Sequence, residues 1–122
     1  MKVLMINGSP RKNGNTSTAL SAMREVFAAE KIDTRLVQIG SEAIRGCIAC
    51  TACRQTGRCA FDDLVNRVAP LLQESDGLVV GSPVYYASAN ASVIALLDRL
   101  FHSTAFDKTM KVGASVAIGR RG

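Results

Sequence analysis

Apolar and polar residues follow one another along the chain in blocks that predict alternating strands and helices. Short apolar runs occur at residues 3–6, 78–80 and 112–118, and each is bounded by polar or turn-forming residues. Three other segments carry apolar residues at helical spacing. The pattern predicts strand 2–7, helix 16–30, strand 33–39, an irregular loop 40–60, helix 62–74, strand 77–82, loop 83–89, helix 90–103 and strand 111–118.

This succession predicts an α/β fold with a doubly wound parallel sheet and right-handed crossovers. The strands at 2–7, 77–82 and 111–118 are largely apolar, which is typical of parallel strands covered on both faces. Strand 33–39 alternates between polar and apolar residues, so we expect it nearer an edge. Helix N-caps are expected from the Ser/Thr residues of the first helix, from Asp62 or Asp63, and from Asn90.

The segment after the first strand, Gly8–Ser17, has the composition of a phosphate-binding loop and is called the phosphate loop below. Its small residues leave backbone N–H groups accessible at a helix start, where phosphate binds well. It lacks the Gly-Lys-Ser/Thr ending of a nucleoside triphosphate loop and the G-x-G-x-x-G spacing of a dinucleotide fold. It therefore predicts a site for one terminal phosphate, with hydroxyls and a guanidinium from Ser9, Thr16, Ser17 and Arg11.

A second segment of the same kind, Gly81–Tyr86, follows the strand at 77–82 and is called the ring loop below. In a flavodoxin-like sheet, the loops after the first and third strands flank the switch point where FMN binds. The ring loop offers backbone amides for the polar edge of a flat ring, and Tyr85 and Tyr86 to pack on it. Each Gly-Ser-Pro is by itself compatible with an ordinary turn, but the pair at one switch point favours a flavin site.

With these two loops, the chain resembles the NAD(P)H-dependent FMN reductase family of flavodoxin-like proteins. The matching segments are residues 8–17 and residues 81–85 with the helix that runs on to Arg99. By position, the resemblance implies phosphate contacts from Ser9, Arg11, Asn15, Thr16 and Ser17. It implies flavin-ring contacts from Pro83, Val84, Tyr85 and Tyr86, and a further contact at Gly119. Ala87 stands where the family commonly has Gly.

All four cysteines lie in one short stretch with the spacing Cys-x2-Cys-x2-Cys-x5-Cys: Cys47, Cys50, Cys53 and Cys59. The two short gaps bring three thiolates to one side of a compact loop, and Gly57 lets the longer arm return the fourth. This geometry suits a [4Fe–4S] cluster, although the last gap differs from that of the bacterial ferredoxin run. A zinc site and a loop of free thiols are the alternatives, whereas disulfides are not expected in a cytosolic chain.

The cysteine motif resembles that of iron–sulfur flavoproteins, a branch of the same family. Arg45, Arg54 and Arg58 lie among the cysteines and are expected to balance the charge of a cluster. Farther along the chain, Asp98 and Arg99 are expected to pack together or to form a salt bridge.

Length and composition indicate one soluble domain over residues 1–122, with a cysteine-rich loop at 45–60. The net charge of +5 comes from scattered basic residues, and few aromatic residues are present. An anionic small ligand accounts for this charge as well as nucleic acid does, so nucleic-acid binding is not expected. No apolar run is long enough to span a membrane and no signal-peptide layout is present, so we expect a cytoplasmic protein without a membrane partner.

The resemblance implies an FMN-dependent oxidoreductase that passes electrons from NAD(P)H or a ferredoxin-like donor to a small acceptor. The acceptor classes are quinone, free flavin, metal ion and oxygen. No catalytic side chain is expected, because the flavin carries the chemistry. Two alternatives stay open: a flavin-binding electron-transfer or redox-sensing module without turnover of its own, and an FMN reductase without a cluster.

The family has a further helix and a fifth strand beyond the segment matched here. The expected sheet order is therefore 2-1-3-4 with the fifth strand absent from this chain, and the domain is expected to be C-terminally incomplete. Strand 111–118 would then form a long apolar edge. From the resemblance, we expect a homo-oligomer.

Overall fold

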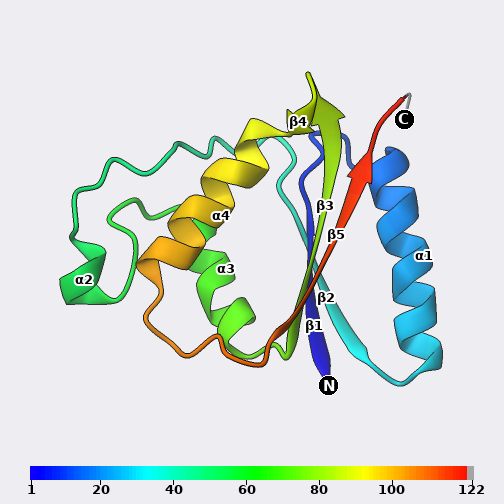
Figure 1. The fold of residues 1–122 in the computed structure, drawn as a ribbon, viewed down its shortest axis with the longest axis horizontal. Helices are drawn as coiled ribbons and strands as arrows, with labels where there is room; N and C mark the ends of the chain where they lie inside the picture. The colour runs from blue at the N-terminus through cyan, green and yellow to red at the C-terminus, as the bar shows by residue number, and fades with distance from the viewer. Residues whose placement is uncertain (121–122) are drawn as a thin grey trace.

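The computed structural model describes residues 1–120, which fold into alternating strands and helices (Figure 1). The elements are β1 (Lys2–Asn7), α1 (Asn15–Ala29), β2 (Asp33–Gln38), α2 (Cys53–Thr56), α3 (Leu64–Gln73), β3 (Gly77–Tyr85), β4 (Ser88–Ala89), α4 (Ala91–Ser103) and β5 (Val112–Ile118). The predicted order of long strands and helices is confirmed. Two short elements were not predicted: α2 in the irregular loop 40–60, and β4 in the loop 83–89.

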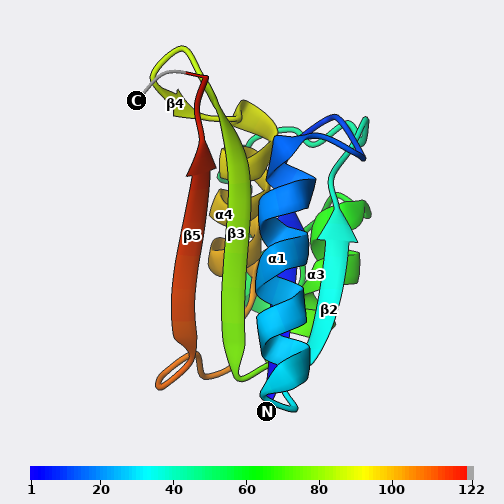
Figure 2. The same cartoon turned by 90° about the vertical axis from the view of Figure 1, so that its right-hand side faces the viewer.

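The four long strands form a parallel sheet in the order β2-β1-β3-β5, and β4 adds a short antiparallel hairpin to β3. The predicted flavodoxin-like order 2-1-3-4 is confirmed, with β5 as the fourth long strand. Figure 2 shows β3 beside β5, with β2 at the opposite side of the sheet. Asn7 pairs with Gly81 in the register of β1 and β3, so the phosphate and ring loops begin side by side.

Helices cover both faces of the sheet, with α1 on one face and α3 and α4 on the other (Figures 1 and 2). Successive strand residues point to opposite faces. Leu4 and Ile6 of β1 accordingly join the core formed with α3 and α4, whereas Val3 and Met5 join Leu20 of α1 in a second core. This explains why β1 is continuously apolar. None of the helices within residues 1–120 is long and apolar enough to cross a membrane.

The outer strands of the sheet differ in how well they are covered. The alternating strand β2 lies at an edge, as predicted. Strand β5 lies at the opposite edge, and most of its residues are exposed, including Val112. The expectation that this apolar strand is covered on both faces is therefore wrong, whereas the expectation of an apolar edge at 111–118 agrees with the structure.

The start of α1 leaves backbone N–H groups open at the phosphate loop, unlike the capped starts of α3 and α4. Asp63 caps α3 by accepting from the N–H of Val65 at 3.0 Å, and Asn90 caps α4 by accepting from the N–H of Ser92 at 2.8 Å. The N-cap of α1 is instead Gly14, and no side chain among residues 1–120 caps this helix. The expected Ser/Thr cap is wrong, and the first N–H groups of α1 remain available to a ligand.

Candidate functional site

The phosphate loop and the ring loop are joined at the carboxyl ends of β1 and β3. The N–H of Gly8 donates to the carbonyl of Gly81 at 2.7 Å. A Cβ on Gly8 would lie 1.9 Å from Cγ2 of Val93, and a Cβ on Gly81 would lie 2.9 Å from Cδ1 of Leu20. Both positions need glycine because the loops, α1 and α4 approach this closely.

Asn7, which is fully buried at the end of β1, shapes the phosphate loop. Its Oδ1 accepts from the N–H of Ser9 at 3.0 Å, and the Ser9 Oγ accepts from the N–H of Arg11 at 3.1 Å. Gln38 of β2 donates to the Ser9 carbonyl at 2.5 Å. Because the Ser9 oxygen is an acceptor within the loop, its hydroxyl hydrogen remains free to be donated to an anion. The Asn7 Nδ2 has no partner among residues 1–120.

The predicted phosphate ligands gather around the uncapped start of α1. Ser9 and Thr16 are buried, Ser17 is half-buried, and Arg11 and Asn15 are exposed. The first turn of α1 holds no acidic residue. Open N–H groups, the positive end of the helix dipole and a nearby guanidinium are a combination that binds phosphate.

The ring loop is the end of a strand and the start of a hairpin, rather than the loop predicted for 83–89. Strand β3 continues to Tyr85 and turns back into β4 through Tyr86 and Ala87, which both have positive φ, at 47° and 64°. Such a turn normally carries Gly or Asn, so this chain departs from the usual turn residues at both positions. Ser82 fixes the base of the hairpin, because its Oγ accepts from the N–H of Asn90 at 2.9 Å.

The hairpin presents the predicted ring contacts at the top of the sheet in Figure 1. Val84, Tyr85 and Tyr86 are exposed, and Pro83 is half-buried. Pro83 pairs with Ile118 in the β3–β5 register, so Gly119 directly follows β5 at this same edge. The structure thus brings all the predicted phosphate and ring residues to one edge of the sheet. Their contacts with a flavin stay a prediction.

The four cysteines lie in the cysteine loop (residues 45–60), and they line one pocket. Cys47 and Cys50 are exposed, whereas Cys53 and Cys59 are half-buried. The Cys53 thiol contacts the carbonyl of His102, near the end of α4, at 3.8 Å. Cys53 thus lies near the end of α4, whereas the ring loop lies near its start. The beginning of the cysteine loop comes closer to the ring loop, because Gly46, directly before Cys47, lines a second pocket together with Tyr85.

The backbone of the cysteine loop is held in an uncommon conformation. Ala49 and Thr51, between the first three cysteines, have positive φ of 54° and 60°. Residues without the freedom of glycine adopt such angles at a cost of about 1–2 kcal/mol each. The N–H of Ala49 donates to the Cys47 sulfur at 3.4 Å. Strain of this kind is concentrated at functional sites.

Within residues 1–120, no three Cys, His, Asp or Glu side chains converge closely enough to hold a single metal ion. The thiols instead surround a pocket, to which Ser103 also contributes a buried hydroxyl without a partner in the described residues. Four free thiols around one pocket are the donor set of a [4Fe–4S] cluster, in which thiolates hold separate irons. The number and kind of donors present therefore fit a cluster, and the choice between a cluster and zinc stays a prediction.

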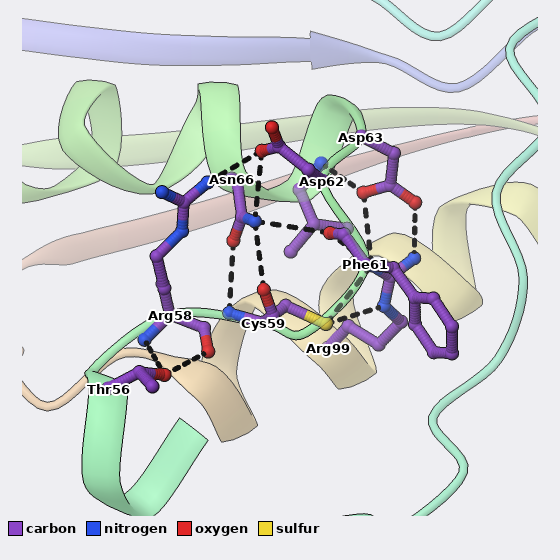
Figure 3. A network of polar contacts seen from close by, with 9 residues as sticks. Thr56, Arg58, Cys59, Phe61, Asp62, Asp63, Asn66 and Arg99 are labelled. Carbon is purple, nitrogen blue, oxygen red and sulfur yellow. Dashed lines mark hydrogen bonds and ion pairs between the residues drawn. The ribbon is translucent and has the colours of Figure 1, made fainter. Parts of the chain in front are cut away.

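Cys59 is the best anchored of the four cysteines, as the network in Figure 3 shows. Asn66 of α3 accepts from the Cys59 N–H at 3.0 Å and donates to the Cys59 carbonyl at 2.9 Å. The same amide donates to the carbonyl of Phe61 at 3.1 Å. The backbone on both sides of this thiol is therefore fixed to a helix that packs on the sheet.

Arg99 of α4 fixes the sulfur itself. Its Nε and Nη2 donate to the Cys59 Sγ at 3.3 and 3.1 Å, and its guanidinium forms a two-pronged ion pair with Asp63 at 2.6 and 3.0 Å. Arg99 is 1% exposed. Burial lowers the pKa of Arg99. Hydrogen bonds and charge attraction from Asp63 and Cys59 together raise it by more than burial lowers it, so the pKa lies above its ordinary value.

Arg99 also closes the cysteine loop. It donates to the carbonyls of Arg45 and Phe61, both at 3.3 Å, and these residues flank the loop. The ring of Phe61 lies against the guanidinium groups of both Arg45 and Arg99. The expected pairing of Asp98 with Arg99 is wrong, because Arg99 points into the protein toward Asp63. Sequence reasoning missed Arg99 as a site residue. The available signal was an arginine within the apolar pattern of α4.

Comparison with known proteins agrees with this geometry. The family model described as NADPH-dependent FMN reductase matches residues 1–122. The chain belongs to the NADPH-dependent FMN reductase family. Within this family it is similar to the iron-sulfur flavoprotein of Methanocaldococcus jannaschii, with 35% identity over 120 residues that cover 98% of this chain and 62% of that protein.

The iron-sulfur flavoprotein of Methanosarcina thermophila is 36% identical over 121 residues, which cover 98% of this chain and 63% of that protein. The chain thus spans somewhat less than two thirds of the length of these two relatives. Among solved structures, RosB with a bound 8-demethyl-8-formylriboflavin-5'-phosphate aligns with a TM-score of 0.76 at 15% identity, covering 100% of this chain and 53% of RosB. At this identity, the likeness shows the shared flavodoxin-like fold.

Proposed function

We propose that this member of the FMN reductase family binds FMN at the carboxyl edge of the sheet and acts as an NAD(P)H-dependent oxidoreductase. The observation that carries the proposal is the junction of the phosphate and ring loops through the Gly8–Gly81 hydrogen bond at 2.7 Å. This junction places an uncapped helix start next to an exposed hairpin with two tyrosines. A phosphate and a flat ring attached to it match these two surfaces.

In this proposal, the phosphate is held by the N–H groups that start α1, by the Ser9 and Thr16 hydroxyls and by the Arg11 guanidinium. Asn15 and Ser17 complete that set. Pro83, Val84, Tyr85 and Tyr86 line the ring, with Gly119 on the β5 side. Bound FMN would supply hydride acceptance from NAD(P)H and delivery of electrons to an acceptor. The chain itself binds and orients the ring and leaves the exposed hairpin side open to small molecules.

We further propose that Cys47, Cys50, Cys53 and Cys59 hold a [4Fe–4S] cluster. Support comes from their shared pocket, from the Ser103 hydroxyl at that pocket, which has no partner within residues 1–120, and from the backbone strain at Ala49 and Thr51. The name iron-sulfur flavoprotein, which both similar relatives carry, points the same way. A cluster would allow electrons to enter or leave one at a time, for example from a ferredoxin-like donor.

A steady-state assay tests the proposed activity. The full chain loaded with FMN, with NADPH as donor and a soluble quinone as acceptor, should oxidise NADPH faster than free FMN at the same concentration. The acceptor classes to compare are quinone, free flavin, ferric complexes and oxygen. Saturable FMN binding without NADPH oxidation would favour the alternative of an electron-transfer or redox-sensing module.

A homo-oligomer in the cytoplasm stays a prediction. The exposed residues of β5 form an apolar sheet edge of the kind that pairs with or is covered by another segment. Gel filtration of the FMN-loaded chain tests this point. An apparent mass near a multiple of 13.0 kDa is expected, and a monomer that binds FMN saturably would contradict the prediction.

A further inference from the structure

We propose that Arg99, held in place by Asp63, is a positioning residue that fixes Cys59 as a cluster ligand and raises the reduction potential of the cluster. This inference rests on the part of the proposed function that assigns a [4Fe–4S] cluster to the four cysteines. It concerns a residue that lies outside the cysteine motif, on a helix 40 positions farther along the chain.

Hydrogen bonds and an ion pair hold the Arg99 guanidinium against the Cys59 sulfur. Two of its N–H groups point at one sulfur, at 3.3 and 3.1 Å, and the others are taken by Asp63 and by carbonyls at both ends of the cysteine loop. Figure 3 shows Arg99 lying between the Cys59 sulfur and the Asp63 carboxylate. Because the side chain is 1% exposed, water does not replace these contacts. The thiol of Cys59 is thus oriented before any metal arrives.

The effect on potential follows from charge. One-electron reduction adds one negative charge to a cluster and breaks no bond to the protein. Hydrogen bonds to a ligating sulfur, together with a nearby positive charge, stabilise the reduced form and raise the potential. Asp63 opposes this effect because its negative charge lies against the same guanidinium at 2.6 Å. Removing Asp63 and removing Arg99 should therefore shift the potential in opposite directions.

Arg58 provides a matched control in the same loop. It precedes Cys59 directly, but its guanidinium pairs with Asp62 at 2.6 Å, and its side chain is 60% exposed. Its hydrogen bonds in the described structure go to Thr56 and Asp62, and none of them reaches a sulfur. An effect of net charge alone would appear in Arg58→Gln as well as in variants of Arg99.

The test is an anaerobic redox titration of the reconstituted full chain, followed by electron paramagnetic resonance of the reduced cluster. Asp63→Asn keeps an N-cap residue for α3 and should raise the midpoint potential. The double variant Arg99→Met with Asp63→Asn leaves net charge unchanged and no buried charge unpaired. It should lower the reduction equilibrium constant about tenfold, which is about 59 mV for one electron. Arg58→Gln should shift it by less than half as much.

Opposite shifts in Asp63→Asn and in the double variant support the proposal. So does loss of iron from the double variant while its FMN affinity stays at the wild-type value, because the sheet is then intact. Shifts of the same sign, or a double variant within the range of Arg58→Gln, would overturn it. Wild-type chain without iron would overturn both this inference and the cluster assignment, whereas the NADPH oxidation assay would still decide the flavin activity separately.

Discussion

The carboxyl edge of the sheet and the cysteine loop are built in different ways. At the sheet edge, buried strands fix the loops: Gly8 and Gly81 are joined backbone to backbone, and each lies too close to its neighbours for a side chain. The cysteine loop has only the short helix α2, and it is held from outside by Asn66 of α3 and Arg99 of α4. The sheet-edge site is therefore formed by the core strands themselves, whereas the cysteine loop depends on side chains of two neighbouring helices.

This difference implies that the two sites can be damaged independently. A change at the sheet edge should affect the fold and flavin binding together, whereas a change at the cysteine loop should release metal and leave the flavin site intact.

Gly8→Ala should produce the largest loss of unfolding free energy and of FMN binding. The new Cβ would lie 1.9 Å from Cγ2 of Val93 and 2.9 Å from the Gly81 carbonyl, so the loop junction must open. Overpacking of this kind costs about 3 kcal/mol of unfolding free energy, and FMN binding should be lost. Gly113→Ala in β5 is the matched control, since a Cβ there meets nothing within 4 Å. Urea denaturation and FMN fluorescence quenching measure both effects. Equal effects in the two variants would show that the Gly8–Gly81 junction does not depend on glycine at position 8.

Asn66→Ala should be the corresponding change at the cysteine loop. It removes the hydrogen bonds to the N–H and carbonyl of Cys59 and to the carbonyl of Phe61. We expect a loss of about 2 kcal/mol in unfolding free energy and a clear loss of iron after reconstitution, with FMN affinity unchanged. Iron and acid-labile sulfide assays beside an FMN titration check this. A parallel fall in FMN affinity would show that the two sites are not independent.

Arg11→Gln isolates the phosphate contribution at the sheet edge. The guanidinium is exposed and lies next to the uncapped start of α1, so its loss should weaken FMN binding about tenfold, or about 1.4 kcal/mol. Riboflavin, which has no phosphate, should bind wild type and variant equally. Lys31→Gln, at the far end of α1, is the charge-matched control. A similar loss of riboflavin affinity would place Arg11 elsewhere in the site.

Ala87→Gly should produce the smallest change in unfolding free energy, and it should stabilise the protein. Ala87 has φ of 64°, which glycine adopts without the steric cost that alanine bears. We expect a gain of about 1 kcal/mol in unfolding free energy. Ala89→Gly, in the adjacent strand β4, should instead destabilise slightly. Thermal denaturation of both variants is the measurement, and destabilisation by Ala87→Gly would show that the hairpin differs from the one described.

The comparison also explains which features the sequence could predict. The strands, the phosphate and ring loops and the cysteine loop were predictable because their signals are local. These signals are apolar runs, Gly-Ser-Pro turns and the spacing of Cys47 to Cys59. The hairpin after Tyr85 was missed because its turn carries Tyr86 and Ala87 rather than the expected Asn or Gly. The partners of Cys59 were missed because Arg99 and Asp63 are 36 residues apart, and only the packing of α3 on α4 brings them together.

The most direct test of the central claim is an equilibrium titration of the purified chain with FMN, repeated with riboflavin and in the presence of inorganic phosphate. We expect saturation at one FMN per chain, markedly weaker binding of riboflavin, and competition between inorganic phosphate and FMN. Failure to saturate, or equal affinity for FMN and riboflavin, would contradict the assignment of the β1–β3 edge as an FMN site.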